Sequence, residues 1–214
     1  MLFLEVSHLR TIIYIDAFNL YYGCLKDSPY KWLDLKALFQ DLLQPQNHIN
    51  QIKYFTARLK SKPTDISAPQ RQQIYIRALE AYIPEISIHY GHFLRHQVRM
   101  ANANPPPNTV KVIKTEEKGS DVNLAVHLLN DAWLDKYDCG IVVSNDSDMT
   151  ESMRLVHKHP ANKVLGLITP HKQISKQLKE HADFVRTIRT SLLRKVQLPT
   201  TIPGTSIRKP DKWN

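Results

Sequence analysis

The sequence predicts an α/β fold, a three-layer α/β/α sandwich around a mainly parallel central sheet. Two observations lead to this class: strand patterns alternate with helical patterns along the chain, and the runs at residues 11–15 and 139–143 are apolar throughout. Uninterrupted apolar runs are typical of strands that are buried on both faces of a parallel sheet. Right-handed crossovers between such strands place helices on both faces.

The expected strands are short apolar or alternating segments. In chain order they are residues 11–15, 51–57, 86–90, 110–113, 139–143, 163–168 and 184–188. Between the third and the fourth of them, residues 91–109 are basic and then rich in proline. We expect this segment to be an excursion near the functional site, because its prolines cannot join a central strand.

The expected helices have apolar residues at three- and four-residue spacing. In chain order they are residues 17–25, 35–42, 69–81, 121–133, 149–157 and 175–182. Local start signals support three of them. Asp34 and Ser120 are expected N-caps, and Pro69 occupies a first turn, where its missing N–H has no helical partner.

The composition indicates one globular domain with an appended segment. Of the 214 residues, 42% are hydrophobic and 23% are charged, which excludes wholesale disorder, collagen and coiled coil. We expect a domain at residues 1–190 and an extended basic tail at 191–214, because the periodic patterns stop near residue 190. No segment resembles a membrane span or a signal peptide, so we expect a cytoplasmic protein that does not bind membranes.

The charge balance favours a polyanionic partner, and RNA is the leading expectation. Lysine and arginine number 29 against 20 acidic residues, a net charge of +9. Arg95 and Arg99, with His92 and His96, are expected to form a basic rim that contacts phosphates. Zinc ligation by the histidines of this segment is disfavoured, since no cysteine accompanies them. The oligomeric state stays open, a homodimer included.

Aspartates follow the predicted strands and open a predicted helix. Asp16 ends the first strand, Asp146 and Asp148 follow the strand at 139–143, and Asp121 lies in a first helical turn. Because carboxyl ends of parallel strands meet at one edge of a sheet, we expect these carboxylates to converge there. Like charges at that range repel unless a cation lies between them, and oxygen ligands suit Mg²⁺ or Mn²⁺. Each aspartate alone could instead cap a helix or complement its dipole.

Other phosphate-handling classes lack their motifs. No Gly-x-Gly-x-x-Gly or P-loop pattern occurs, which disfavours NTPases and dinucleotide-dependent oxidoreductases. A haloacid-dehalogenase-type phosphatase needs a second aspartate two residues after Asp16, and that position is Phe18.

Three segments, in order and spacing, resemble the motifs of a known family. They are Ile-Tyr-Ile-Asp-Ala-Phe-Asn-Leu at 13–20, Glu-Lys-Gly-Ser-Asp-Val-Asn-Leu-Ala at 117–125 and Val-Ser-Asn-Asp-Ser-Asp at 143–148. Together with Ser-Lys-Gln-Leu at 175–178 and Ala-Asp-Phe at 182–184, they resemble the NYN domain, in the LabA-like or DUF88 branch of the PIN-like nucleases. The resemblance covers residues 10–190.

The resemblance implies a PIN-like fold and a metal-dependent ribonuclease that leaves 5′-phosphate and 3′-hydroxyl ends. The metal would be held by the four aspartates at 16, 121, 146 and 148. Asn19 would orient a water or a phosphate, Lys118 would stabilise phosphate charge, and Ser144 and Asn145 are further expected nucleic-acid contacts. Two alternatives stay open: a non-catalytic RNA-binding or regulatory NYN module, and a nucleotide phosphohydrolase on the same scaffold.

Overall fold

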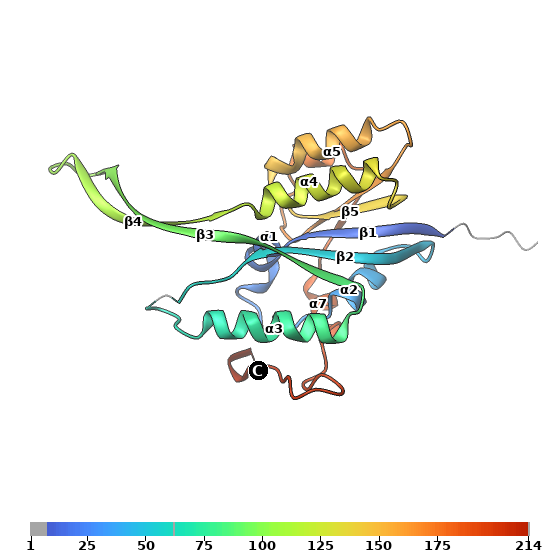
Figure 1. The fold of residues 1–214 in the computed structure, drawn as a ribbon, viewed down its shortest axis with the longest axis horizontal. Helices are drawn as coiled ribbons and strands as arrows, with labels where there is room; N and C mark the ends of the chain where they lie inside the picture. The colour runs from blue at the N-terminus through green and yellow to red at the C-terminus, as the bar shows by residue number, and fades with distance from the viewer. Residues whose placement is uncertain (1–7, 62, 214) are drawn as a thin grey trace, which may run out of the picture.

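The computed structural model describes residues 8–61 and 63–213, and its centre is a seven-stranded sheet with the order β4-β3-β2-β1-β5-β6-β7 (Figure 1). The strands are β1 Leu9–Asp16, β2 Asn47–Ala57, β3 Ile86–Ala101, β4 Thr109–Lys118, β5 Cys139–Val143, β6 Val164–Thr169 and β7 Phe184–Thr187. Every neighbouring pair is parallel except β3 and β4, which are antiparallel. The predicted α/β class with a mainly parallel sheet is confirmed.

Helices follow most of the strands. The α-helices are α1 Ala17–Leu20, α2 Leu35–Leu42, α3 Ala68–Tyr82, α4 Ser120–Trp133, α5 Thr150–His157, α6 Lys176–Lys179 and α7 Thr190–Lys195. A π-helical turn, Tyr21–Leu25, continues α1, and short 3-10 turns lie at Ser147–Met149 and Asp211–Trp213. In the described part of the chain, no helix combines the length and the apolar character that crossing a bilayer requires.

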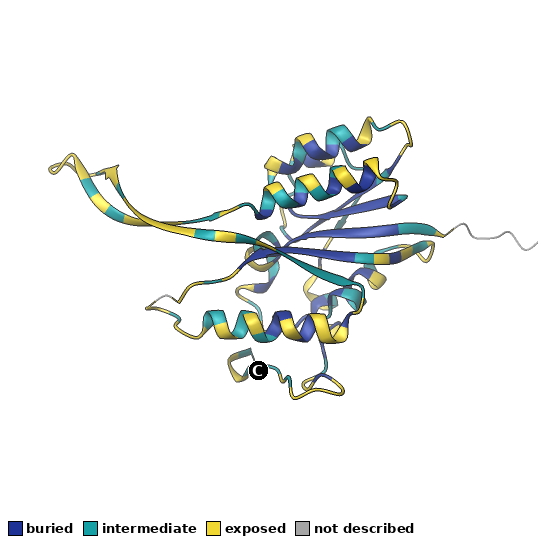
Figure 2. Ribbon diagram, viewed as in Figure 1, coloured by how far each residue is buried: buried dark blue, intermediate teal, exposed yellow. Residues whose placement is uncertain are grey.

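The core lies on both faces of the sheet because the central strands alternate between two clusters. In β1, Ile13 and Ile15 pack into one cluster, with residues of α2 and α3. Ile12 and Tyr14 pack into the other, with residues of α4 and α5. Figure 2 shows the same pattern, with the central strands dark blue and the outer surfaces of the helices yellow. Burial on both faces explains the uninterrupted apolar runs at residues 12–15 of β1 and 141–143 of β5.

The segment after residue 90 differs from the prediction. β3 is 16 residues long and does not end at residue 90 but continues to Ala101. Its outer part pairs with β4 in a two-stranded hairpin, here called the arm, residues 92–118. The prolines lie at its tip, where the Asn102 N–H donates to the Asn108 carbonyl at 3.0 Å. The expected excursion near the site was therefore wrong for the proline-rich part, since the arm carries it away from the body of the molecule (Figure 1).

The C-terminal segment also differs from the prediction, because it packs against the body instead of extending into solvent. Leu193, Val196, Leu198 and Ile202 are buried in the cluster that contains Trp32. The indole N–H of Trp32 donates to the Pro199 carbonyl at 2.9 Å. Leu193 and Val196 belong to the short helix α7 and its C-cap, whereas Leu198 and Ile202 lie outside helices and strands. The apolar pattern is therefore too short to indicate burial from the sequence alone.

One local prediction is corrected at the start of α4. Gly119 is the N-cap residue, with φ 94°, and Ser120 is the first helical residue. A φ in the left-handed region favours glycine, which explains this residue at the turn from β4 into α4.

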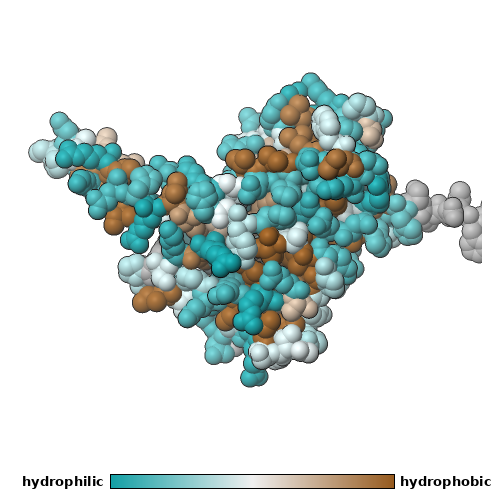
Figure 3. Space-filling view, in the orientation of Figure 1, coloured by the Kyte–Doolittle hydropathy of each residue, from teal (hydrophilic) through white to brown (hydrophobic). Residues whose placement is uncertain are grey.

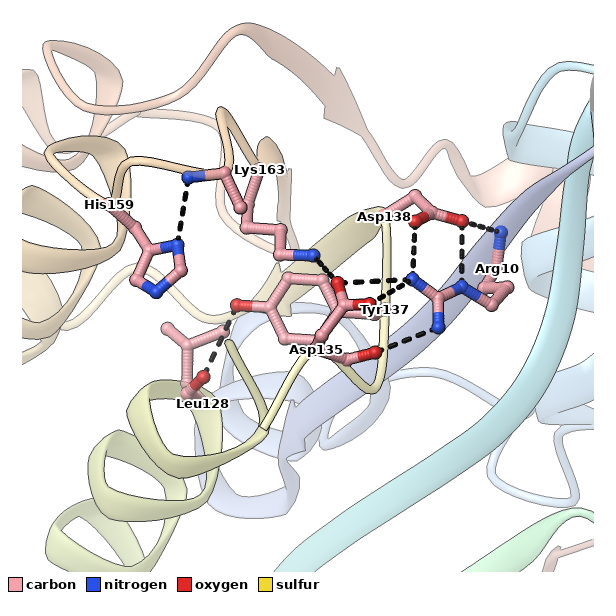
Figure 4. A network of polar contacts seen from close by, with 8 residues as sticks. Arg10, Leu128, Asp135, Tyr137, Asp138, His159 and Lys163 are labelled. Carbon is pink, nitrogen blue, oxygen red and sulfur yellow. Dashed lines mark hydrogen bonds and ion pairs between the residues drawn. The ribbon is translucent and has the colours of Figure 1, made fainter. Parts of the chain in front are cut away.

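A polar network joins the amino ends of β1, β5 and β6, at the edge of the sheet opposite to the strand ends that carry the aspartates (Figure 4). The Arg10 guanidinium donates to both carboxylate oxygens of Asp138, at 2.7 and 3.0 Å, and also contacts Asp135. Lys163 pairs with Asp135, and the Tyr137 hydroxyl donates to the Leu128 carbonyl at 3.2 Å. These contacts tie three strands and α4 together at a distance from the candidate site.

Candidate active site

The site begins where the neighbouring parallel strands β1 and β5 end. Asp16 closes β1 and is 5% exposed, and Ser144 follows β5. The Ser144 hydroxyl donates to Oδ2 of Asp16 at 3.0 Å and accepts the N–H of Asp146 at 3.1 Å. Ser144 therefore fixes the two aspartates relative to each other.

Both aspartates also start helical turns, as their positions before helices suggest. Oδ1 of Asp16 accepts the Asn19 N–H at 2.9 Å at the start of α1. Oδ1 of Asp146 accepts the Asp148 N–H at 3.0 Å at the start of the 3-10 turn. Capping holds each carboxylate in a defined orientation. The second oxygen of Asp16 accepts the Ser144 hydroxyl, whereas the cap does not use the second oxygen of Asp146.

Two further carboxylates reach the same place from the arm and α4. Asp121 lies in the first turn of α4, and Glu117 lies near the end of β4. Oε1 of Glu117 accepts the Ser120 N–H at 3.1 Å. The turn at Gly119 brings Glu117 and Asp121 to one cavity, and Glu117 is an acidic site residue that the sequence analysis missed. Its signal is strand alternation: continuing the predicted strand at 110–113 to residue 117 points its side chain the same way as Ile113.

These groups line an open cavity of about 760 Å³. Its acidic side is formed by Asp16, Glu117, Asp121 and Asp146. Its other walls combine aliphatic and neutral polar residues with aromatic and basic side chains, namely Phe18, Tyr22, Phe93, Lys60, Arg95 and His171. The negative charge is thus confined to one side of a cavity whose rim carries cations, in a chain of net charge +9.

The pKa values of the acidic groups reflect this crowding. Burial, followed by the charges of Asp16, Glu117, Asp146 and Asp148, raises the pKa of Asp121 to about 6. Burial also raises the pKa of Asp16, although the hydrogen bonds from Asn19 and Ser144 oppose the shift. Carboxylates whose charged forms disfavour one another gain stability from a cation between them.

The donor set suits a hydrated magnesium or manganese ion. All of its ligand atoms are carboxylate oxygens, which these ions prefer. Within residues 8–61 and 63–213, no group of three or more histidine, cysteine, aspartate or glutamate side chains is placed so that it could hold a metal ion. Magnesium often uses only one or two carboxylates and completes its shell with water and substrate phosphate. The residues present fit that mode of binding.

The remaining predicted residues divide into structural and accessible groups. Asn19 lines the cavity, and its Oδ1 accepts the Asn145 N–H at 2.9 Å. The Asn145 side chain donates to the Gln173 carbonyl at 3.0 Å and accepts the Ser175 N–H at 2.8 Å. Asn145 does not line the cavity. Ser144 is fully buried, so it positions other residues and has no surface for a nucleic acid. Asp148 is exposed and lies outside the cavity lining, although its charge acts on Asp121.

The arm separates the predicted basic residues by face. Arg95 lines the cavity together with Phe93, Thr115 and Glu117, and Arg99 lies on that same face of β3, farther out. Lys118 is not brought to the cavity, because strand alternation turns its side chain to the opposite face of the arm. There its Nζ lies 3.8 Å from Oε2 of Glu116. His92 and His96 share that opposite face, because their cross-strand partners are Lys118 and Lys114. Lys60 and His171 also line the cavity, and the sequence analysis did not include them.

Comparisons with known proteins give one family and two individual similarities. The family model described as NYN domain matches residues 10–189. The chain is 30% identical to the 6-hydroxy-3-succinoylpyridine 3-monooxygenase HspA of Pseudomonas putida, over 98% of this chain and 77% of that protein. A crystal structure of a protein of unknown function from Vibrio parahaemolyticus has the same fold, with a TM-score of 0.54 and 18% identity, over 90% of this chain and 98% of that one.

Proposed function

Because this chain belongs to the NYN domain family, whose fold is nuclease-like, we propose that it is a metal-dependent ribonuclease of the LabA-like (DUF88), PIN-like branch. The observation that carries the proposal is the convergence of Asp16, Glu117, Asp121 and Asp146 on one cavity, with the pKa of Asp121 at about 6. Such a cluster of carboxylates suits a divalent cation, and a cation held there suits the phosphodiester of an RNA.

Each residue has a distinct role in this proposal. Asp16 and Asp146, fixed through Ser144, hold Mg²⁺ or Mn²⁺, with Glu117 and Asp121 completing the negative side of the cavity. When bound there, such an ion would supply charge neutralisation at the phosphate and a lower pKa for a water molecule. The carboxylate of Asp121 would accept a proton from an attacking water. Arg95 and Lys60, at the cavity wall, contact the phosphates.

The arm extends this phosphate-binding surface. Its cavity side carries Arg95 and Arg99 on β3, and Lys111 lies opposite Arg99 on β4. Figure 3 shows hydrophilic residues over most of the arm, interrupted by apolar spots. Arginines spaced along an extended strand suit the backbone of an extended RNA, because phosphate contacts fix position without reading sequence.

The test is a cleavage assay on a panel of RNAs with Mn²⁺ or Mg²⁺, with a chelator control. We expect cleavage by the wild-type chain that Asp146→Asn lowers at least a hundredfold. The matched control is Asp27→Asn, since Asp27 is exposed and outside the cavity. Cleavage that survives in Asp146→Asn, or that is indifferent to the chelator, would refute the proposal. Salt-dependent RNA binding without turnover would instead indicate a binding module.

A second candidate comes from the relative whose name denotes a pyridine monooxygenase. The similarity covers 98% of this chain, and the cavity has aromatic walls at Phe18 and Phe93, whose ring centroids are 5.8 Å apart. Incubation with 6-hydroxy-3-succinoylpyridine, oxygen and a two-electron reductant is therefore the parallel assay. Turnover there, without RNA cleavage, would favour this candidate.

A further inference from the structure

A second, smaller cavity adjoins the carboxylate cavity. Its volume is about 230 Å³, and its walls come from the π-helical turn, the end of β2, the start of α3 and the C-terminal 3-10 turn. Aromatic side chains form much of the lining: Tyr21, Tyr22, Tyr54, Tyr75 and Trp213. Pockets for drug-sized ligands measure roughly 300–1,000 Å³, so this cavity has room for a single planar ring system.

The two cavities share a boundary. Phe18, Tyr22, Leu59 and Lys60 line both of them. Phe18 lies two residues after Asp16 in the chain, so the shared wall begins two residues from a carboxylate of the candidate site. A ligand bound at the carboxylates can therefore place an attached ring in the smaller cavity.

Trp213 belongs to the wall of the smaller cavity. Its ring centroid lies 6.3 Å from that of Trp32 and 6.0 Å from that of Tyr75. Lys212 holds the same turn by its contact with Asp65 at 3.2 Å. The docked C-terminal segment thus supplies one aromatic face that the 10–189 family match does not include.

Some polar side chains of this cavity already have hydrogen-bond partners. The Tyr75 hydroxyl donates to the Leu33 carbonyl at 2.8 Å. Gln72 is engaged through both of its amide atoms, by the Leu59 N–H and the Ala57 carbonyl, each at 2.9 Å. Tyr54 is 8% exposed and lines this cavity, so a ligand in the cavity can meet its side chain. A tyrosine hydroxyl can both donate and accept a hydrogen bond, which suits the polar edge of a ring.

We propose that this cavity binds a nucleobase of the RNA, on the nucleotide next to the phosphate at the carboxylates. The aromatic walls stack on the ring, and the Tyr54 hydroxyl hydrogen-bonds to its edge. This inference rests on the proposed ribonuclease function, and it adds a base subsite to it. Stacking accepts any base, whereas one hydroxyl adds a modest preference among bases.

The experiment measures binding without cleavage, with Ca²⁺ in place of Mn²⁺ and a fluorescent short RNA. It compares this RNA with the same RNA carrying one abasic ribose at each position in turn. We expect an abasic ribose at one position to weaken binding about tenfold, because stacking on one base contributes at that level. We expect Tyr22→Ala to weaken the binding of the intact RNA by a similar factor. Tyr22 is 58% exposed, so its removal leaves the fold intact. Tyr54→Phe is expected to change the preference among bases.

The matched control is Tyr82→Ala, because Tyr82 is 37% exposed and lies outside both cavities. Equal affinity for all the abasic RNAs, or unchanged affinity in Tyr22→Ala, would overturn the base subsite even if the enzyme cleaves RNA. A base-dependent affinity that Tyr22→Ala removes would support the subsite even if no cleavage occurs. Displacement by 6-hydroxy-3-succinoylpyridine but not by mononucleotides would assign the cavity to small heteroaromatic acids and overturn the proposal.

Discussion

Replacing Asp121 by asparagine should stabilise the metal-free protein while removing activity. The pKa of this carboxyl is about 6 in the folded chain, against 3.8 in its ordinary state. A difference of about two pKa units corresponds to roughly 3 kcal/mol against folding at pH 7.5. Because Asp121 is only half-buried, solvent screening reduces this to about 1 kcal/mol. For a chain of this length, that predicts a Tm about 2–4 °C higher in Asp121→Asn.

The pH dependence supplies the sign of the effect. A raised pKa in the folded state means that the folded protein takes up a proton first as the pH falls through about 6. The penalty on the wild-type chain is therefore present at pH 7.5 and falls by about half at pH 5. Asparagine has no carboxylate to protonate, so the advantage of Asp121→Asn should shrink over the same interval.

Thermal unfolding followed by circular dichroism, in chelator at pH 7.5 and pH 5, measures both quantities. Asp27→Asn is the control, since it removes an exposed carboxylate outside the cavity. Added Mn²⁺ should raise the Tm of the wild-type chain more than that of Asp121→Asn. A lower Tm for Asp121→Asn in chelator, or a difference that is the same at both pH values, would refute the electrostatic reasoning.

Three further predictions concern other parts of the molecule. Glu117→Gln should weaken Mn²⁺ activation severalfold, measured as the metal concentration for half-maximal cleavage, and unchanged activation would exclude Glu117 from the cluster. Arg99→Gln should lower the slope of log affinity against log salt by about one for RNA, whereas Lys118→Gln, on the opposite face of the arm, should leave it unchanged. Asp138→Ala should lower the Tm without changing cleavage kinetics, because its bonds to Arg10 lie at the other end of the strands; a loss of kcat would contradict that separation.

The central part of the fold could be predicted from the sequence because its signals are local. Each of these signals lies in one short segment of the sequence: the apolar runs of β1 and β5, and the helical periodicity of α4. Asp16 and Asp146 could be paired for the same reason, since the residue after a buried parallel strand has only one edge of the sheet available to it. Ser120 was misplaced by one position because a glycine with φ 94° took the N-cap.

By itself, then, the sequence determined the α/β class, the strand ends at which the aspartates lie, and the family motifs that carry them. Only the tertiary structure decided that Glu117 rather than Lys118 enters the cavity, that the basic residues of the arm divide between two faces, and that the tail packs beside Trp32. The physical reason is range. Burial of one strand on both faces is visible within five residues, whereas the face of β4 depends on its register with β3, and the docking of the tail depends on a tryptophan more than 150 residues away in the chain.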